Sequence, residues 1–460
     1  MLPDNVLLET FELYLGKDDP IRLGRIYGHD YDYDEWQTLV HVCRRWRCIV
    51  FASPRRLDLK LYCTGKRLVN SNTLDVWPAL PIVIVTEGMQ SKEDAINIIA
   101  ALRHHNRVCK IDCSSEQFQD FLLEEFAAID EPFLALTSLA LSSYRQQNVP
   151  VLPDSFLGGS APCLRSLHLY GIPYPSVGKL LLSTTNIVHL NLSSIPHSGY
   201  ISPETFVPCL SMSARLESLD LGFRYPLSRA HRASRHPPPL TRVAFPNLTS
   251  LCFSGDMEYL EDILSQIETP MLKCGRFYFF NQLLFDTQLL GHFIRRTETF
   301  MTIHRARIEF NTSTVWITFW GLEASEPLWL DIRCGPLDWQ LSALVPILNS
   351  ILSSLPALEI LEIAVSREDW QVDIGAIQWQ EFFHVFTSVK DMILERENSV
   401  RLIAPVLQEL AGERATEVLP ALQNLFLPTH YWQPSEPIKE AIEQFIATRQ
   451  LCGHPVTVHQ

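Results

Sequence analysis

Four side chains in the chain resemble a metal site. Cys109 and Cys113 stand four residues apart and follow the pair His104-His105. Thiolate and imidazole groups at such short spacings are common zinc ligands. The segment 108–113 also has the pattern of a short apolar strand, in which Cys113 packs inward as a small hydrophobic side chain. The strand explains both thiols, so we expect neither a metal ion nor a cofactor.

No other catalytic constellation stands out. The sequence contains no G-x-G-x-x-G, G-x-x-x-x-G-K-[ST], H-E-x-x-H or G-x-S-x-G motif. Its many carboxylates are dispersed, and nothing pairs two of them as a general acid and base. We therefore expect a binding protein and no enzyme activity. An enzyme with an unfamiliar signature is one rival hypothesis, and a pocket with convergent titratable groups of perturbed pKa would favour it.

Composition restricts the class of partner. The chain has 460 residues, a net charge of −14 and 47% hydrophobic residues. This charge disfavours nucleic acid and anionic membranes, because both require clustered cations. The 11 cysteines are scattered without a CxxC pair, and the N-terminus lacks a basic signal-peptide region. We expect a soluble protein of the cytoplasm, the nucleus or both.

Most of the chain repeats the pattern L-x-x-L-x-L at intervals close to those of leucine-rich repeats. Clear copies begin at Leu136, Leu164 and Leu216. The middle positions of the clear and weaker copies are 111, 139, 167, 190, 219, 251, 361, 392 and 425. Residues 57–460 are therefore expected to form an irregular leucine-rich-repeat-like solenoid of the α/β class, with parallel strands on the concave side, helices outside and a C-terminal capping helix. The stretch 270–340 does not follow the pattern.

In such a strand, the residue between the two paired leucines points away from the core. These positions predict a substrate-binding face for a protein ligand. The candidates are His168, Asn191, Asp220 and Glu362. Each of them is also compatible with an ordinary solvated strand position.

Residues 1–56 differ from the repeats and predict two amphipathic helices. Leu7 and Phe11 lie on one apolar face, and Trp36, Cys43 and Trp46 lie on another at helical spacing. So short a segment cannot bury both stripes alone. The helices must either cap the solenoid or dock on another protein.

The same residues resemble an F-box. The resemblance is carried by Leu2-Pro3 with Val6, Leu7 and Phe11, then by Val42-Cys-Arg-Arg-Trp46 and a closing Pro54. Residues 42–57, Trp77–Ile82 and 407–459 are similar to basidiomycete fungal F-box proteins in particular. The resemblance implies a substrate-receptor subunit of an SCF-type ubiquitin ligase, held by a Skp-type adaptor on a cullin scaffold. By position, the adaptor-binding residues would be Leu2, Pro3, Val6, Leu7, Phe11, Val42, Cys43 and Trp46, with Phe11 and Trp46 as the anchors. The alternative is a leucine-rich repeat scaffold outside any ligase, whose F-box-like helices only cap the solenoid.

Three further segments need an interpretation. An acidic, tyrosine-rich insert at 16–35 separates the two helices where F-box proteins usually have a tight turn. The arginine- and proline-rich loop 224–242 is interpreted as a connector, with recognition of acidic or phosphorylated partners as the alternative. The tryptophans at 316, 320, 329 and 339 are interpreted as core residues.

Overall fold

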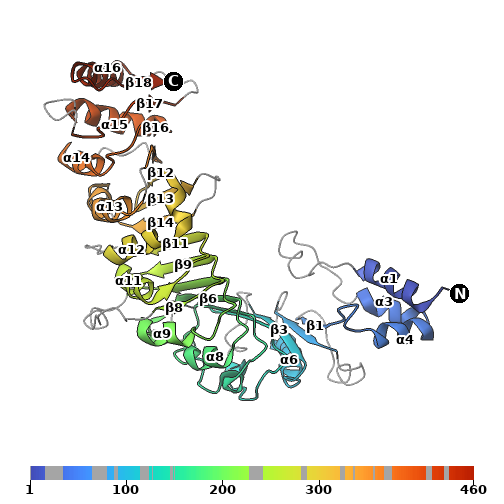
Figure 1. The fold of residues 1–460 in the computed structure, drawn as a ribbon. Helices are drawn as coiled ribbons and strands as arrows, with labels where there is room; N and C mark the ends of the chain where they lie inside the picture. The colour runs from blue at the N-terminus through green and yellow to red at the C-terminus, as the bar shows by residue number, and fades with distance from the viewer. Residues whose placement is uncertain are drawn as a thin grey trace. The chain divides into compact units, whose positions relative to one another are not determined.

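The computed structural model consists of two compact units, Met1–Tyr200 and Ile201–Gln460. The structure describes residues 2–15, 35–64, 80–86, 92–113, 124–126, 128–145, 149, 151–226, 242–280, 287–321, 327–334, 337–355, 358–366, 376–410, 417–428 and 435–459. The insert 16–34 and most of the basic loop, 227–241, therefore lie outside the described residues. Both units combine helices with a mostly parallel sheet (Figure 1), as the repeat pattern predicted.

The described residues of unit 1 begin with the short helices α1 (Asp4–Leu15), α3 (Glu35–Val42) and α4 (Arg44–Ala52). The expectation of one continuous helix across residues 36–50 was wrong, because Cys43 interrupts it. Its backbone is extended (φ −160°, ψ 167°), and its Sγ accepts a hydrogen bond from the Trp46 backbone N–H at 3.4 Å. This N-cap starts a new helix and changes the chain direction, which places the Trp46 ring 4.7 Å from that of Phe11.

The sheet of unit 1 is a run of parallel strands. In order they are β1 (Leu61–Thr64), β2 (Ile82–Val85), β3 (Val108–Cys113), β4 (Ser138–Ser142), β5 (Ser166–Tyr170) and β6 (His189–Ile195). Ile111, Leu139, Leu167 and Leu190 are direct cross-strand partners. The register predicted from the repeat spacing is thus confirmed, and all four side chains are buried. Helices α6 (Lys92–Leu102) and α8 (Val177–Ser183) connect successive strands.

The sheet of unit 2 begins with the same arrangement. Its spatial order is β7 (Ser218–Phe223), β9 (Ser250–Gly255), β11 (Cys274–Phe279), β14 (Leu328–Arg333), β13 (Thr314–Gly321), β12 (Ile303–Phe310), β15 (Ile360–Val365), β16 (Asp391–Leu394), β17 (Asn424–Phe426) and β18 (Thr457–His459). Leu219 pairs with Leu251, and Leu361, Met392 and Leu425 are aligned, so these predicted registers are confirmed as well. A separate pair joins β8 (Val243–Ala244) to β10 (Ile267–Glu268).

An antiparallel insertion interrupts this parallel sheet. From β11 the chain passes to β12, returns through β13, and ends with β14 beside β11. Strand β13 is antiparallel to both of its neighbours, whereas β12 is parallel to β15. The expectation of parallel strands alone was therefore wrong between residues 303 and 333. The chain reverses direction from β12 to β13 and again from β13 to β14, so the all-parallel strand arrangement of the repeats is lost there.

The helices of unit 2 pack on the face that carries the leucines. They are α9 (Pro203–Cys209), α11 (Met257–Gln266), α12 (Gln288–Arg296), α13 (Leu337–Leu352), α14 (Ala376–His384), α15 (Glu397–Leu410) and α16 (Glu436–Leu451). Phe310 of β12, for example, lies 5.9 Å from the Trp379 ring and 6.0 Å from the Phe382 ring, both of α14. Figure 1 shows α11–α16 gathered on one side of the strands. On the opposite face of β12 and β13, side chains such as Arg307 and Trp316 are partly exposed.

Candidate functional site

The candidate site is the part of this opposite face formed by β11, β14, β13, β12 and β15, here called the polar face of unit 2. It exists because polar and apolar residues alternate along the strands. In β13, and in β12 from Arg305 onward, every second side chain is buried, and those between them are partly exposed. Cross-strand register then aligns side chains of neighbouring strands into rows, such as the row of Arg276, Trp329, Thr318, Arg307 and Glu362.

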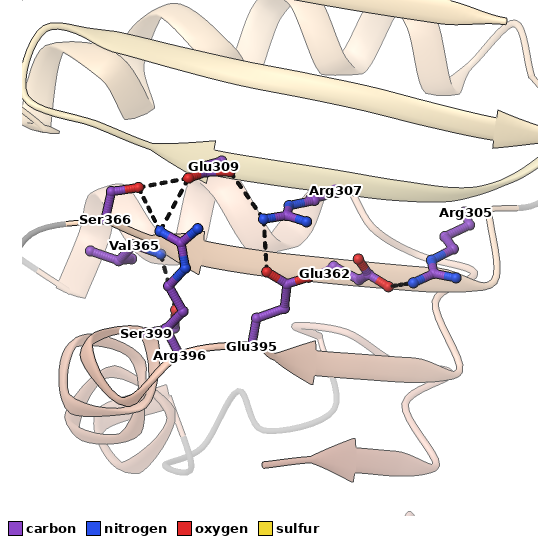
Figure 2. A network of polar contacts seen from close by, with 9 residues as sticks. All are labelled: Arg305, Arg307, Glu309, Glu362, Val365, Ser366, Glu395, Arg396 and Ser399. Carbon is purple, nitrogen blue, oxygen red and sulfur yellow. Dashed lines mark hydrogen bonds and ion pairs between the residues drawn. The ribbon is translucent and has the colours of Figure 1, made fainter. Parts of the chain in front are cut away.

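A charge network occupies one end of the polar face (Figure 2). Glu309 accepts hydrogen bonds from Arg307 at 3.0 Å and Ser366 at 2.7 Å, and it pairs with Arg396 at 3.2 Å. Arg307 also reaches Glu395 at 2.8 Å. The network therefore joins β12 to the residues after β15 and β16. It fixes the spacing of these strands with charge-assisted hydrogen bonds.

Arg305 and Glu362 extend the network along β12 and β15. Burial raises the pKa of the Glu362 carboxyl, and the guanidinium of Arg305 partly opposes that change. Glu362 is only 2% exposed. Its carboxylate is therefore engaged within the chain.

Three aromatic residues lie beside this network. Trp316 and Trp320 are four residues apart on the same face of β13, and Trp329 of β14 pairs with Thr318, which lies between them. All three are partly exposed, so their interpretation as core residues was wrong; the side chain of Trp339 lies outside the described residues. Arg305 lies 5.4 Å from the Trp320 ring. Tryptophan and arginine are enriched among the residues that dominate protein-binding energies.

Asp331 lies within the aromatic part of the polar face. Its direct cross-strand partners are Tyr278 on β11 and Trp316 on β13. The indole N–H of Trp316 donates to Asp331 Oδ2 at 3.2 Å. Burial raises the pKa of the Asp331 carboxyl, while the positive charge of Arg333 lowers it.

The four substrate-face candidates do not form one group: two lie in unit 1 and two in unit 2. His168 and Asn191 are direct partners on β5 and β6 of unit 1, and Asn191 accepts from Ser193 at 2.7 Å. In unit 2, Asp220 on β7 and Glu362 on β15 are separated by β9, β11, β14, β13 and β12. The pKa of Asp220 is raised by burial, and Cys252 hydrogen-bonds to it. One sequence signal for this part of the sheet was the alternation of polar and apolar residues in 305–310.

The predicted adaptor-binding residues divide by exposure. Leu2 is 58% exposed and Val42 59%, and Pro3 and Cys43 are also exposed. Arg45 brings these residues to one end of the helices, because it donates to the Leu2 carbonyl at 2.5 Å and to Asp4 at 2.6 Å. The remaining residues contribute mainly to packing between the helices: Leu7 and Phe11 are buried, and Val6 and Trp46 are partly buried.

The cysteine–histidine segment forms part of the sheet. A β-bulge in β3 leaves Cys109 beside β2, where its Sγ donates to the Ile82 carbonyl at 3.3 Å. Cys113 packs in the core, and burial raises its pKa. Within the described ranges, no three His, Cys, Asp or Glu side chains come together in a group suited to a metal ion.

No helix of the described residues has the length and apolar character needed to cross a membrane.

The charge network should contribute measurably to stability. We expect Glu309→Gln to reduce the free energy of unfolding by about 1–3 kcal/mol, because two arginines lose a charged acceptor in a partly buried site. Glu359→Gln is the matched control, since it removes an exposed pair with Lys390. Urea unfolding of both variants measures the difference. Equal stability of the two variants would show that Glu309 is dispensable.

Comparisons with known proteins add little to this geometry. No family model matches the chain, and no curated protein matches it. One similar solved structure is the leucine-rich repeat-containing protein LegL7 from Legionella pneumophila, which is 17% identical. The match covers 72% of this chain and 96% of that one, with a TM-score of 0.29.

Proposed function

We propose that this chain is a protein-binding subunit without catalytic activity. In this proposal, its N-terminal helices dock on a Skp-type adaptor of an SCF ubiquitin ligase, and the polar face of unit 2 selects a protein substrate. The main support is the position of Leu2, Pro3, Val42 and Cys43, which are exposed at one end of the helices around Arg45. Apolar side chains that a small helical unit leaves exposed together are typical of a docking surface.

The F-box resemblance supports the same assignment, with one change in roles. Phe11 is 1% exposed and packs against Trp46. We therefore assign Phe11 to holding the helices together, and Leu2 and Val42 to adaptor contact. The acidic insert has no role in this proposal.

The adaptor proposal predicts a specific loss of binding. We expect Leu2→Asp combined with Val42→Asp to weaken binding of the full chain to the purified Skp adaptor at least about tenfold, because each change places a charge in an apolar interface. Leu451→Asp is the control, since Leu451 of α16 is 88% exposed. Titration calorimetry measures the affinities, and circular dichroism verifies the fold.

Undiminished adaptor binding by the folded double variant would refute this docking surface. Failure of the unaltered chain to bind would favour the second candidate, a repeat scaffold whose helices serve as a cap. One observation favours that candidate specifically. The Trp36 indole N–H donates to the Lys60 carbonyl at 3.0 Å, directly before β1, so the helices are attached to the repeats.

A further inference from the structure

Asp331 is unusual among the carboxylates of the polar face. Glu309, Glu362 and Glu395 each form an ion pair with an arginine. No arginine or lysine of the described residues forms an ion pair with Asp331. Its Oδ2 accepts from Trp316, while its Oδ1 is buried without a hydrogen-bond partner in the described part of the chain. A buried carboxylate oxygen without a partner is energetically unfavourable.

The surroundings of Asp331 have the composition of a cation site. Tyr278 and Trp316 flank it on the neighbouring strands, and Trp329 precedes it by two residues on the same face of β14. Direct cross-strand partners have Cβ atoms about 5 Å apart, so Tyr278 and Trp316 lie close to the Asp331 carboxylate, and Trp329 is its neighbour along the strand. Aromatic faces attract cations, and a carboxylate adds a charge-assisted hydrogen bond.

We propose that Asp331, Tyr278, Trp316 and Trp329 receive a lysine or arginine side chain from a basic segment of a partner protein. This inference rests on the proposed function, since it specifies the chemistry of the substrate that the polar face would select. The partner's cation pairs with Asp331 between the aromatic rings.

Charge complementarity favours a basic partner over an acidic one. The arginines Arg305, Arg307 and Arg396 of this face already form ion pairs with glutamates of the chain. The whole chain has a net charge of −14, which attracts basic segments over long distances. Two cations of the chain also lie close to the site. The positive charge of Arg333 lowers the pKa of the Asp331 carboxyl, and that of Arg276 lowers the pKa of the Tyr278 hydroxyl.

The raised pKa of Asp331 should make the stability of the protein depend on pH. An acid whose pKa is raised in the folded state binds its proton more tightly there than in the unfolded state. The free energy of unfolding therefore falls as the pH rises through the pKa that Asp331 has in the folded protein. Below the usual pKa of an aspartate carboxyl this loss of stability is absent. We expect Asp331→Asn to raise the unfolding midpoint at neutral pH, and this gain to disappear in acid.

The direct test uses fluorescein-labelled hexalysine and hexaglutamate as probes of the full chain, by fluorescence anisotropy at about 0.15 M salt. We expect hexalysine to bind preferentially and Asp331→Asn to weaken its binding about three- to tenfold. Glu443→Gln removes the same charge from an exposed position on α16 and should have no effect. Equal weakening by both variants would identify non-specific attraction, and preferential binding of hexaglutamate would identify an anion site; either result overturns the inference.

Adaptor binding by the same variants separates this inference from the proposed function. Asp331→Asn should bind the Skp adaptor with unchanged affinity, because Asp331 belongs to unit 2 and the docking helices to unit 1. A chain that binds the adaptor but has no hexalysine site at Asp331 refutes only the cation inference. A chain that fails to bind the adaptor but loses hexalysine binding on Asp331→Asn refutes only the adaptor proposal.

Discussion

Replacing Phe11 with alanine is expected to unfold the N-terminal helices and abolish adaptor binding. Phe11 is 1% exposed, and its ring lies 4.7 Å from that of Trp46, so it joins α1 to α4. Truncating a buried phenylalanine costs about 3–5 kcal/mol. So small a helical unit has about that much stability in total. Adaptor affinity and limited proteolysis of the N-terminal segment measure the two effects.

The control for this prediction lies on the same helix. Leu13 is 85% exposed, so Leu13→Ala should leave both the proteolysis pattern and the fold unchanged. The repeats should retain their own unfolding transition in Phe11→Ala, because their leucine ladder does not depend on this side chain. A Phe11→Ala variant that binds the adaptor normally and resists protease would show that the helices do not depend on the Phe11–Trp46 contact.

Replacing Arg449 with methionine is expected to destabilise the C-terminal end of unit 2 by about 3 kcal/mol. The Arg449 side chain is fully buried in α16 and donates to the carbonyls of Val418, Leu419 and Leu422 at 3.4, 3.2 and 3.3 Å. Methionine fills a similar volume but leaves these carbonyls without their donor. Unfolding followed by circular dichroism measures the loss.

Arg401→Met provides the comparison for Arg449. Arg401 of α15 pairs with Glu397 one helical turn away, and both side chains are largely exposed. Exposed pairs of this kind contribute at most about 1 kcal/mol. If the two methionine variants were equally stable, the three carbonyls would have to find other donors, and Arg449 would not be the residue that attaches α16 to segment 417–422.

The leucine spacing predicted both the class of fold and much of the strand register. Ile111, Leu139, Leu167 and Leu190 are aligned as their positions in the repeat require. This was possible because each repeat must bury its leucines against the next one, so the periodicity is recorded locally in the sequence. The same reasoning identified the residues on the opposite face, including His168, without identifying which of them act together.

Two features could not be derived from periodicity. The break at Cys43 depends on a thiol acting as an N-cap, although the apolar stripe continues across it as if the helix were unbroken. The tryptophans of β13 and β14 resembled core residues because large apolar side chains are usually buried. Their position was decided by alternation along an antiparallel insertion, which lies within a stretch without the repeat pattern.

The sequence by itself therefore determined the repeat architecture and the inward-facing leucines. Only the tertiary structure decided that β12 and β14 lie on opposite sides of β13, that Glu362 pairs with Arg305, and that Asp331 lies between aromatic residues. The physical reason is the range of the interactions. Leucine burial repeats at a short period along the chain, whereas the network joins residues as much as 87 positions apart, as in the pair of Arg396 with Glu309.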